Sequence, residues 1–498
     1  METAPLSPEY LETLLTVCPV RVRPEGKAEA LRLPPGACAL TGAAPGARLI
    51  LLPGHRSPFR FEAVTPGAFP VLQLEGPEGT VFLEFLSDRD FGPPGELSPA
   101  AMRAYYDALF RHVLRRAGSF AFRLQSAASS PDPRLRWGSR FCRLVFRRPG
   151  GYTAGMALYP FQGAEHSAAF LTAALAWFHH CRESRRGFDN HLVLCCHRDG
   201  AVQVPGRLGL LNPAMVRPHL WAYDPPLRAL EEWGLAAGGA TAPADFEFTP
   251  FRPSHDNPVV ADLLRRHAPH LDLETQPRAF DQVTRLGLPI AQVFGPSEGD
   301  VRIGWRSPRV PYPDFPPREL DRWVRDVIRL RSFPAPERRH DVYRRCPERW
   351  MECAVLKDLR GLDPGFRPEW VYRQVPAWRG GGRSVLDVLT LDAGNRPAVL
   401  EIKADRDEAC LFQALDYWDK VREGMEAGTF QACGYFEGVR LAGGPPRVFI
   451  VTPLFVTHPR LLRVAGYLSR DIPLFLLEGN LDWRGGWRTL RRSAPGAG

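Results

Sequence analysis

An apolar run that carries two charges is the feature that most constrains how this chain folds. Residues 398–404 have the composition of a buried β-strand, yet they include Glu401 and Lys403. Side chains two positions apart on a strand project from the same face, so these two charges are expected side by side. Burying an unpaired charge is costly, so some group must compensate Glu401.

A third charged residue is expected beside this pair. Asp387 lies in the strand-like run 384–391, and the turn at 392–395 is short enough to join that run to 398–404 as a hairpin. Two carboxylates on adjacent strands, with an ammonium group beside them, suit one hard divalent cation and an activated water. Only four of the 64 Lys and Arg residues are lysines, so Lys403 is a candidate for chemistry that arginine cannot perform.

The elements around the hairpin follow the order α-β-β-β-α-β, with an α-β extension. Pro347 opens the first helix, where Glu352 shares a face with Leu356 and therefore points towards the sheet. Gln413 and Tyr417 lie four apart, on one face of the second helix. The expected helices are 347–360, 407–423 and 459–468, and the expected strands are 370–377, 384–391, 398–404, 447–452 and 474–477.

Residues 341–478 resemble the PD-(D/E)xK nuclease superfamily. Asp387, thirteen intervening residues and then Glu401-Ile402-Lys403 are similar to its central motif, although Leu386 stands where the motif has proline. The pattern alone is weak, because such spacings arise by chance. Its position on a strand, a turn and a second strand makes it more specific.

Two further motifs carry the resemblance. Glu352 fits the acid that the superfamily has on its first helix, and Gln413-Ala-Leu-Asp-Tyr417 fits the Q-x-x-x-Y motif of RecB-like and NucS-like members. The same block also resembles the C-terminal part of uncharacterised bacterial proteins. The fold that this implies is an α/β restriction-endonuclease-like C-terminal domain, preceded by an α+β N-terminal region of unknown fold.

The resemblance implies a metal-dependent nuclease that hydrolyses phosphodiester bonds, of DNA rather than RNA, with Mg²⁺ as cofactor and Mn²⁺ as its substitute. Asp387 and Glu401, with the Ile402 carbonyl, would hold the metal, and Glu352 would reach it through water. Lys403 would orient or deprotonate the attacking water and stabilise charge on the phosphate.

The remaining expected roles concern the substrate. Gln413 would position Lys403 or the substrate backbone, while Tyr417 would pack beneath the site or face nucleic acid. Phosphate contacts are expected from Arg484 and Arg488 in the tail and from the Arg-rich helix 318–331. The expected partner is nucleic acid, and both a homodimer and a separate partner protein stay open.

Three other interpretations stay open. The hairpin could carry an ordinary surface pair of Glu401 and Lys403, although exposed pairs contribute little stability and arginine would serve as well. The chain could be a nucleic-acid-binding or regulatory protein with a catalytically inactive nuclease-like domain. It could also be an effector nuclease whose N-terminal region senses a small molecule or partner.

The N-terminal two thirds show no comparable motif. Strand-like and helical runs alternate there in an α+β pattern without an internal repeat, and no lysine has the spacing of a Walker A loop. Pro- and Gly-rich joints delimit the expected domains. These are α+β domains of unknown function at 1–130 and 131–305, a Pro- and Arg-rich linker and helix at 306–340, and the nuclease-like domain at 341–492.

Composition places the chain among folded globular proteins, with 44% hydrophobic and 24% charged residues. The net charge of +9 is spread thinly and identifies no partner by itself. Residues 1–10 lack the pattern of a secretory signal, and no apolar run is long enough to cross a bilayer. We therefore expect a cytoplasmic protein without a membrane partner.

The ten cysteines form no C-x-x-C pair, and we expect most of them to be buried. Residues 179–181 and 195–197 come nearest to a zinc-binding set. Adjacent strand residues point to opposite faces, however, so at most one of Cys195 and Cys196 could turn towards a given ion.

Overall fold

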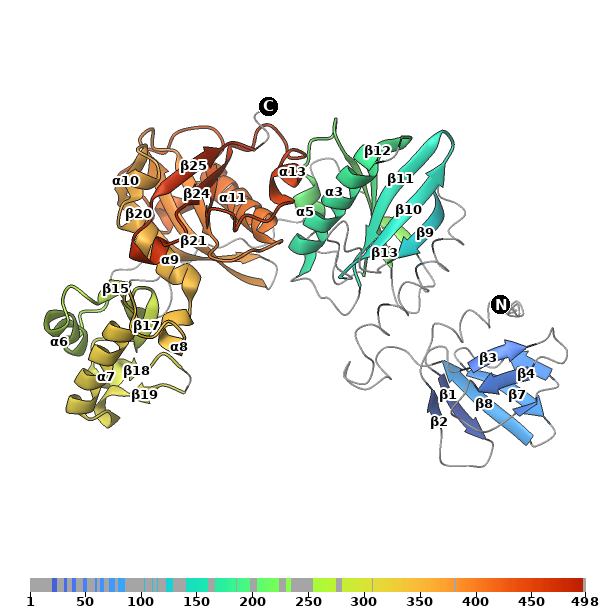
Figure 1. Cartoon of the computed structure of the whole chain (residues 1–498), viewed down its shortest axis with the longest axis horizontal. Coiled ribbons are helices and arrows are strands. Elements are labelled where there is room, and N and C mark those ends of the chain that lie inside the picture. Colours follow the sequence, from blue (N-terminus) through green and yellow to red (C-terminus); the bar gives the residue numbers. More distant parts are fainter. Residues whose placement is uncertain are drawn as a thin grey trace. The chain divides into compact units, whose positions relative to one another are not determined.

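The structure is a computed structural model of the 498-residue chain. It describes short strands between residues 20 and 85, single helical positions at 103, 110 and 114, and residues 122–128, 140–159, 166–184, 186–197, 204–223, 230–233, 254–274, 280–306, 308–379 and 382–495. The chain divides into two compact units (Figure 1). Unit 1 comprises residues 1–205 and 214–237, and unit 2 comprises residues 206–213 and 238–498.

The C-terminal part of unit 2 is built on one six-stranded mixed sheet with the order β20-β21-β22-β23-β24-β25 (Figure 1). β20, β21 and β22 pair antiparallel, β22, β23 and β24 pair parallel, and β25 is antiparallel to β24. β22 is buried along its whole length, which explains its apolar sequence. The bounds are β20 Phe366–Arg379, β21 Gly382–Asp392, β22 Pro397–Ile402, β23 Arg447–Pro453, β24 Leu474–Gly479 and β25 Thr489–Ser493.

The main helices and strands of this part follow one another along the chain in the order α9-β20-β21-β22-α11-β23-α13-β24-β25. α9 begins at Pro347, a residue favoured at the first helical position, and Met351 and Val355 pack in one cluster with Leu400 and Ile402 of β22. α11 packs against β22 and β23. The bounds are α9 Pro347–Leu356, α10 Leu359–Leu362, α11 Cys410–Glu426, α12 Thr429–Ala432, α13 Leu461–Ala465 and η5 Trp483–Gly485.

A small lobe precedes α9 within unit 2. Its antiparallel sheet has the order β15-β16-β17-β18-β19, and α6 and α7 pack with it. On α7, Leu320, Val324 and Val327 lie on one face and are buried in the same cluster as Val283 and Ile290 of the sheet. The bounds are α6 Pro258–Arg266, β15 Asp272–Glu274, β16 Asp281–Arg285, β17 Leu288–Val293, η3 Glu298–Asp300, β18 Val301–Ile303, β19 Val310–Pro311, η4 Tyr312–Asp314, α7 Pro317–Leu330 and α8 Asp341–Arg344.

The lobe differs from the expected division of this region. Residues 306–340 were expected as a linker and helix that separate two domains. The apolar face of α7 instead completes the core of the lobe, because the short strands of the sheet cannot bury their own apolar side chains. The segment is therefore a packed part of the lobe.

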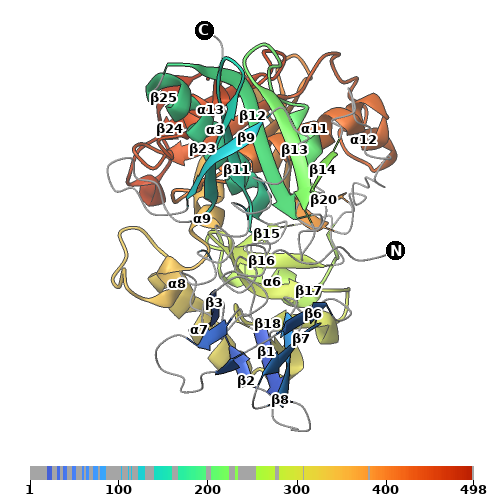
Figure 2. The ribbon, with the colours of Figure 1, turned by 90° about the vertical axis from the view of Figure 1, so that its right-hand side faces the viewer.

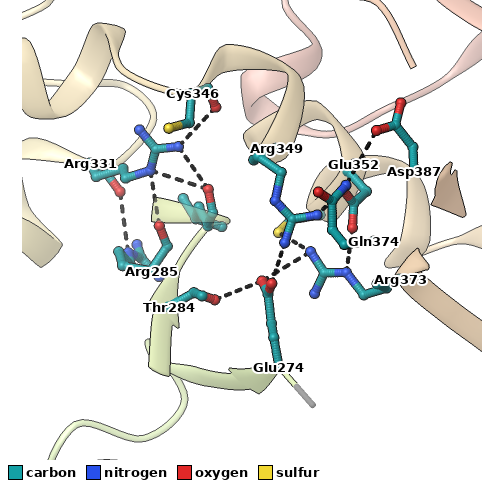
Figure 3. A network of polar contacts seen from close by, with 12 residues as sticks. Glu274, Thr284, Arg285, Arg331, Cys346, Arg349, Glu352, Arg373, Gln374 and Asp387 are labelled. Atoms are coloured by element: carbon teal, nitrogen blue, oxygen red, sulfur yellow. Dashed lines mark hydrogen bonds and ion pairs between the residues drawn. The ribbon is translucent and has the colours of Figure 1, made fainter. Parts of the chain in front are cut away.

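A fully buried guanidinium joins the lobe to the start of α9 (Figure 3). Arg331 follows α7, is 0% exposed, and lies over the ring of Trp350 at 4.7 Å. Burial lowers the pKa of Arg331 to about 10. Its nitrogens donate to the carbonyl oxygens of Arg285, Leu286, Val342, Arg345 and Cys346. One planar group thus satisfies carbonyls from the β16–β17 turn, α8 and the N-terminus of α9.

Unit 1 contains another six-stranded sheet, here called the first sheet because it comes before the β20–β25 sheet, the second sheet, in the chain. The two sheets have the same arrangement of strands. Strands β11, β12 and β13 of the first sheet lie side by side in Figure 2. β9, β10 and β11 pair antiparallel, β11, β12 and β13 pair parallel, and β14 is antiparallel to β13. α3 connects β11 to β12, as α11 connects β22 to β23. The bounds are β9 Arg123–Ala128, β10 Cys142–Arg148, β11 Gly151–Ala157, α3 Ser167–Ser184, β12 Phe188–His197, α5 Val204–Leu208, β13 Arg217–Tyr223 and β14 Leu230–Trp233.

No internal repeat is visible in the sequence, yet the two sheets share one topology. The two sheets match strand by strand in order and in direction. A shared topology constrains only which positions are apolar, so side chains can diverge until no repeat is visible in the sequence.

The strands between residues 20 and 85 form two antiparallel sheets, with the orders β2-β1-β8-β7-β6 and β3-β4-β5. Their bounds are β1 Val20–Pro24, β2 Leu31–Leu33, β3 Cys38–Thr41, β4 Arg48–Leu51, β5 Phe59–Arg60, β6 Ala63–Pro66, β7 Val71–Gly76 and β8 Gly79–Phe85. In the described parts of the chain, no helix combines the length and the hydropathy needed to traverse a membrane.

We expect Arg331→Lys to lower the free energy of unfolding by about 2–4 kcal/mol. An ammonium group has three donors, so it leaves at least two of the five buried carbonyls without a partner, at a cost of about 1–3 kcal/mol each. Arg329→Lys is the matched control, because Arg329 lies in the last turn of α7, two residues before Arg331, with its side chain 56% exposed. Urea unfolding followed by tryptophan fluorescence would measure both. Equal effects of the two substitutions would contradict the role of Arg331.

Candidate functional site

The structure brings Asp387, Glu401 and Lys403 together at the end of the β21–β22 hairpin. Asp387 accepts a hydrogen bond from the backbone N–H of Ile402 through Oδ2, at 2.9 Å. Lys403 Nζ lies 3.0 Å from Glu401 Oε1. The grouping follows from the hairpin, because the register that pairs Val388 with Leu400 places Asp387 opposite Glu401.

Glu401 is the least compensated of these groups. Its side chain is buried, with the residue 3% exposed, and its Oε2 atom has no hydrogen-bond partner. An ionised oxygen left in this state is costly, so the site fits a cation that would complete its coordination. The pair of Glu401 and Lys403 is not an ordinary surface pair, since both side chains are largely buried.

The pKa values of the two carboxyls reflect this shortage of positive charge. Burial raises the pKa of Asp387 to about 7, and the neighbouring Glu352 adds to the rise. Burial and the adjacent Asp387 likewise raise the pKa of Glu401. A divalent cation between the two carboxylates would reverse both effects.

Lys403 lies among three acidic side chains. Its ammonium nitrogen is 3.0 Å from Glu401, 3.5 Å from Asp407 and 3.9 Å from Glu348. Burial alone would lower the pKa of Lys403, but the attraction of Glu401 and Glu348 outweighs it, and the net shift is upward. The lysine is therefore held as a cation, suited to orienting water and stabilising negative charge.

Glu352 points towards the sheet, as its helical spacing predicts, but its carboxylate is held by other side chains (Figure 3). Its carboxylate, 1% exposed, accepts hydrogen bonds from Arg349 and Arg373 and, at 3.1 Å, from the amide of Gln374. Both of its oxygens are thus engaged with side chains. The structure consequently does not bring Glu352 into a metal-binding group with Asp387 and Glu401, because the two guanidinium groups compensate its charge instead.

Gln374 is a residue that sequence reasoning missed. Its Nε2 donates to Glu352 at 3.1 Å and to Asp387 Oδ1 at 3.2 Å, so one amide connects the two acids. The residue lies within β20, at the position opposite Asp387, and has a φ of 50°. A left-handed conformation in a non-glycine strand residue costs about 1–3 kcal/mol and tends to occur at functional sites. No sequence pattern signals it.

The small lobe supplies the next group of this chain of contacts. Glu274, at the end of β15, forms ion pairs with Arg349 and Arg373 (Figure 3). It also accepts a hydrogen bond from the Thr284 hydroxyl at 2.8 Å. Buried charges are stable only in such paired sets. The contacts run from Glu274 through the two arginines to Glu352, and then through Gln374 to Asp387.

Gln413 and Tyr417 lie on the α11 side of the candidate site. Gln413 Oε1 is buried and has no hydrogen-bond partner, which leaves it suited to a group not present in the chain. Burial, Glu401 and Asp387 together raise the pKa of Tyr417, so its hydroxyl lies within electrostatic range of both carboxylates. Their expected roles towards substrate stay predictions.

The arginines that were expected to bind substrate lie in varied surroundings. The Arg484 guanidinium stacks on Trp483 at 4.3 Å and on Tyr343 at 5.0 Å, so it is partly covered by aromatic rings. Arg488 is exposed. In the helix expected at 318–331, Arg331 is buried and cannot contact phosphate, whereas Arg325 pairs with Asp321 on the surface.

A metal centre built from three or more His, Cys, Asp or Glu side chains is not found in the described parts of the chain. Residues 179–181 and 195–197, the zinc alternative, form no such group either. Mg²⁺ usually binds through one or two carboxylates and keeps several waters. Asp387 and Glu401, with the unpartnered Glu401 Oε2, fit that requirement.

The chain matches no protein-family model and no curated protein.

The raised pKa of Asp387 predicts a pH dependence of stability in EDTA. The folded protein keeps a proton on Asp387 up to about pH 7, whereas the unfolded chain releases it near the ordinary value of 3.8. The proton on Asp387 therefore stabilises the folded protein in full below about pH 4. As the pH rises to about 7, this stabilisation is lost and the free energy of unfolding falls by at most about 4 kcal/mol. Asp387→Asn lacks this loss. Urea unfolding at several pH values would measure it, and identical pH profiles would contradict it.

Gln374 should tune the metal affinity of Asp387. Gln374→Gly removes the amide and keeps the left-handed backbone without strain, so we expect Mn²⁺ affinity to fall about tenfold while stability is largely retained. Gln374→Asn, which keeps an amide, should recover part of the affinity. Calorimetric titration of the metal-free protein would measure it, and unchanged affinity in Gln374→Gly would count against the connection.

Proposed function

We propose that the C-terminal domain is a metal-dependent nuclease that hydrolyses phosphodiester bonds, with DNA as its preferred substrate. The observation that carries the proposal is the grouping of Asp387, Glu401 and Lys403, in which a buried carboxylate oxygen of Glu401 lacks any partner. A purely structural domain has no need for two buried carboxylates whose pKa values are raised.

Asp387 and Glu401 would hold Mg²⁺, or Mn²⁺ in its place. When bound, the cation would polarise the phosphate and lower the pKa of a bound water. The ammonium group of Lys403 would orient the attacking water and stabilise the negative charge that develops on the phosphate oxygens. Its three acidic neighbours keep it charged for this purpose.

The surrounding residues would position these groups. Gln413 Oε1, which has no partner in the chain, would accept a hydrogen bond from the water or from Lys403. Glu352 would act through Gln374 to orient Asp387, in place of the water-mediated contact with the metal that the resemblance implies. The N-terminal region would select or regulate the substrate.

A second candidate is a nucleic-acid-binding or regulatory protein with an inactive nuclease-like domain. It is favoured by one observation, namely that Glu352 is held by two arginines and does not join the other acids. The two candidates differ in one measurable property, which is metal-dependent cleavage.

Asp387→Ala and Lys403→Ala should each lower cleavage at least about 100-fold, since each removes a group that acts on the transition state. Lys403→Ala should leave nucleic-acid binding almost unchanged. Lys357→Ala is the matched control, because Lys357 is exposed at the end of α9. The measurement is cleavage of labelled single-stranded, duplex, flap and mismatched DNA, and of RNA, in Mg²⁺, Mn²⁺ or EDTA.

The outcomes separate the candidates. Cleavage that needs a metal and is lost in both variants would support the nuclease and identify its substrate. Cleavage retained in Lys403→Ala would contradict the role proposed for Lys403. Binding without cleavage by the wild type under every condition would favour the inactive domain.

A further inference from the structure

The two six-stranded sheets can be compared position by position through their hydrogen bonds. In the second sheet, the N–H of Lys403 donates to the Val451 carbonyl of β23, at 2.9 Å. In the first sheet, the N–H of Leu158 donates to the Cys195 carbonyl of β12, at 2.8 Å. Each donor directly follows the strand that pairs parallel with the next, so Leu158 occupies the position of Lys403.

The other two positions of the site follow from the same register. Met156 lies two residues before Leu158, as Glu401 lies two residues before Lys403. Met156 pairs with Arg143 of the neighbouring strand β10. Arg143 therefore takes the place that Asp387 has opposite Glu401.

The first sheet thus carries different side chains at the positions of Asp387, Glu401 and Lys403. Met156 and Leu158 are apolar and each is 1% exposed, and Arg143 carries a positive charge where the second sheet has a carboxylate. A guanidinium and two apolar side chains offer no oxygen ligands for a hard divalent cation. The Arg143 guanidinium would instead attract an anion.

A pairing within unit 2 supports the correspondence. The five-residue helices α5 and α13 each lie between two parallel strands, and Leu211 and Leu468 each follow their helix by three residues. These two equivalent residues form an antiparallel bridge. The flanking hydrogen bonds, both 2.8 Å, run from Asn212 N–H to the Tyr467 carbonyl and from Ser469 N–H to the Leu210 carbonyl.

We infer that residues 122–233 are a second copy of the fold that carries the candidate site, and that this copy binds the phosphate backbone of a nucleic-acid strand at Arg143 without a metal. The choice of nucleic acid as ligand rests on the proposed function. The correspondence of positions between the two sheets is independent of the proposed function.

The surroundings of Arg143 suit a phosphate. Its guanidinium lies over the ring of Trp177, at 5.7 Å, and the indole N–H of Trp177 donates to the Leu144 carbonyl at 3.1 Å, which fixes the ring. A planar, permanently charged guanidinium binds phosphate oxygens in a bidentate manner. Residues 122–233 also contain 14 arginines, no lysine and 8 acidic residues, so the copy as a whole attracts a polyanion.

One chain would then hold one cutting site and one binding site of common origin. The copy with Asp387 and Glu401 cleaves, and the copy with Arg143 holds a strand. A single chain would therefore cut one strand at each encounter, because the residues that the structure describes provide one pair of metal ligands, Asp387 and Glu401.

Binding by the full chain in EDTA, where metal-dependent cleavage is excluded, tests the role of Arg143. The probe is a labelled single strand and the matching duplex, each titrated at several salt concentrations. We expect Arg143→Met to weaken binding about tenfold and to reduce the salt slope by about one, whereas Arg143→Lys retains most of the affinity. Arg186→Met, at an exposed position of the same copy, is the control and should change binding less than threefold. Equal losses in Arg143→Met and Arg186→Met would overturn the inference.

The number of bound metal ions tests the second half of the inference. Mn²⁺ titration of the metal-free chain should find one ion per chain in wild type and in Arg143→Met, and none in Asp387→Asn. An ion that persists in Asp387→Asn and disappears in Arg143→Met would overturn the metal-free assignment. If wild type binds no ion, the proposed nuclease function fails, while the comparison of Arg143 variants in EDTA still decides the phosphate site. Thermal unfolding of each variant separates lost binding from lost folding.

Discussion

Buried negative charge is the constraint on which the rest of the C-terminal domain depends. Glu352, Asp387 and Glu401 all lie in or near an apolar sheet, where a carboxylate must be compensated or protonated. The three acids meet this requirement in different ways. Two arginines compensate Glu352, whereas Glu401 has Lys403 beside it and Asp387 accepts hydrogen bonds from the Ile402 N–H and the Gln374 amide. The remaining deficit of positive charge is what a metal ion would supply.

Compensation of Glu352 ties the small lobe to the candidate site. Arg349 and Arg373 bind Glu352 and also Glu274 of β15, so the lobe contributes one of the four charges of this cluster. Arg331 reinforces the same junction through five backbone carbonyls. The lobe is thereby part of the support of the site, and a change in its packing would be transmitted to Asp387 through Gln374.

The two sheets share one topology but carry different side chains at the corresponding positions. The sheet that retains Asp387 and Glu401 can attract a cation, and the sheet that has Arg143 at the corresponding position can attract an anion. The fold does not depend on which charged side chains stand at these positions, since it depends on apolar positions that both copies keep. A nuclease needs both properties, because its substrate is a polyanion and its chemistry is assisted by a metal.

The sequence by itself determined the local part of this picture. Strand periodicity and a short turn were enough to place Asp387, Glu401 and Lys403 together, because side chains two apart share a face and a hairpin fixes its own register. Helical spacing placed Gln413 and Tyr417 on one face of α11. Only the tertiary structure decided the partners of Glu352, since Glu274 and Gln374 come from distant segments that no periodicity connects. It also revealed the second copy of the fold, because topology depends on the pattern of buried positions, which survives after the side chains that carry chemistry have been replaced.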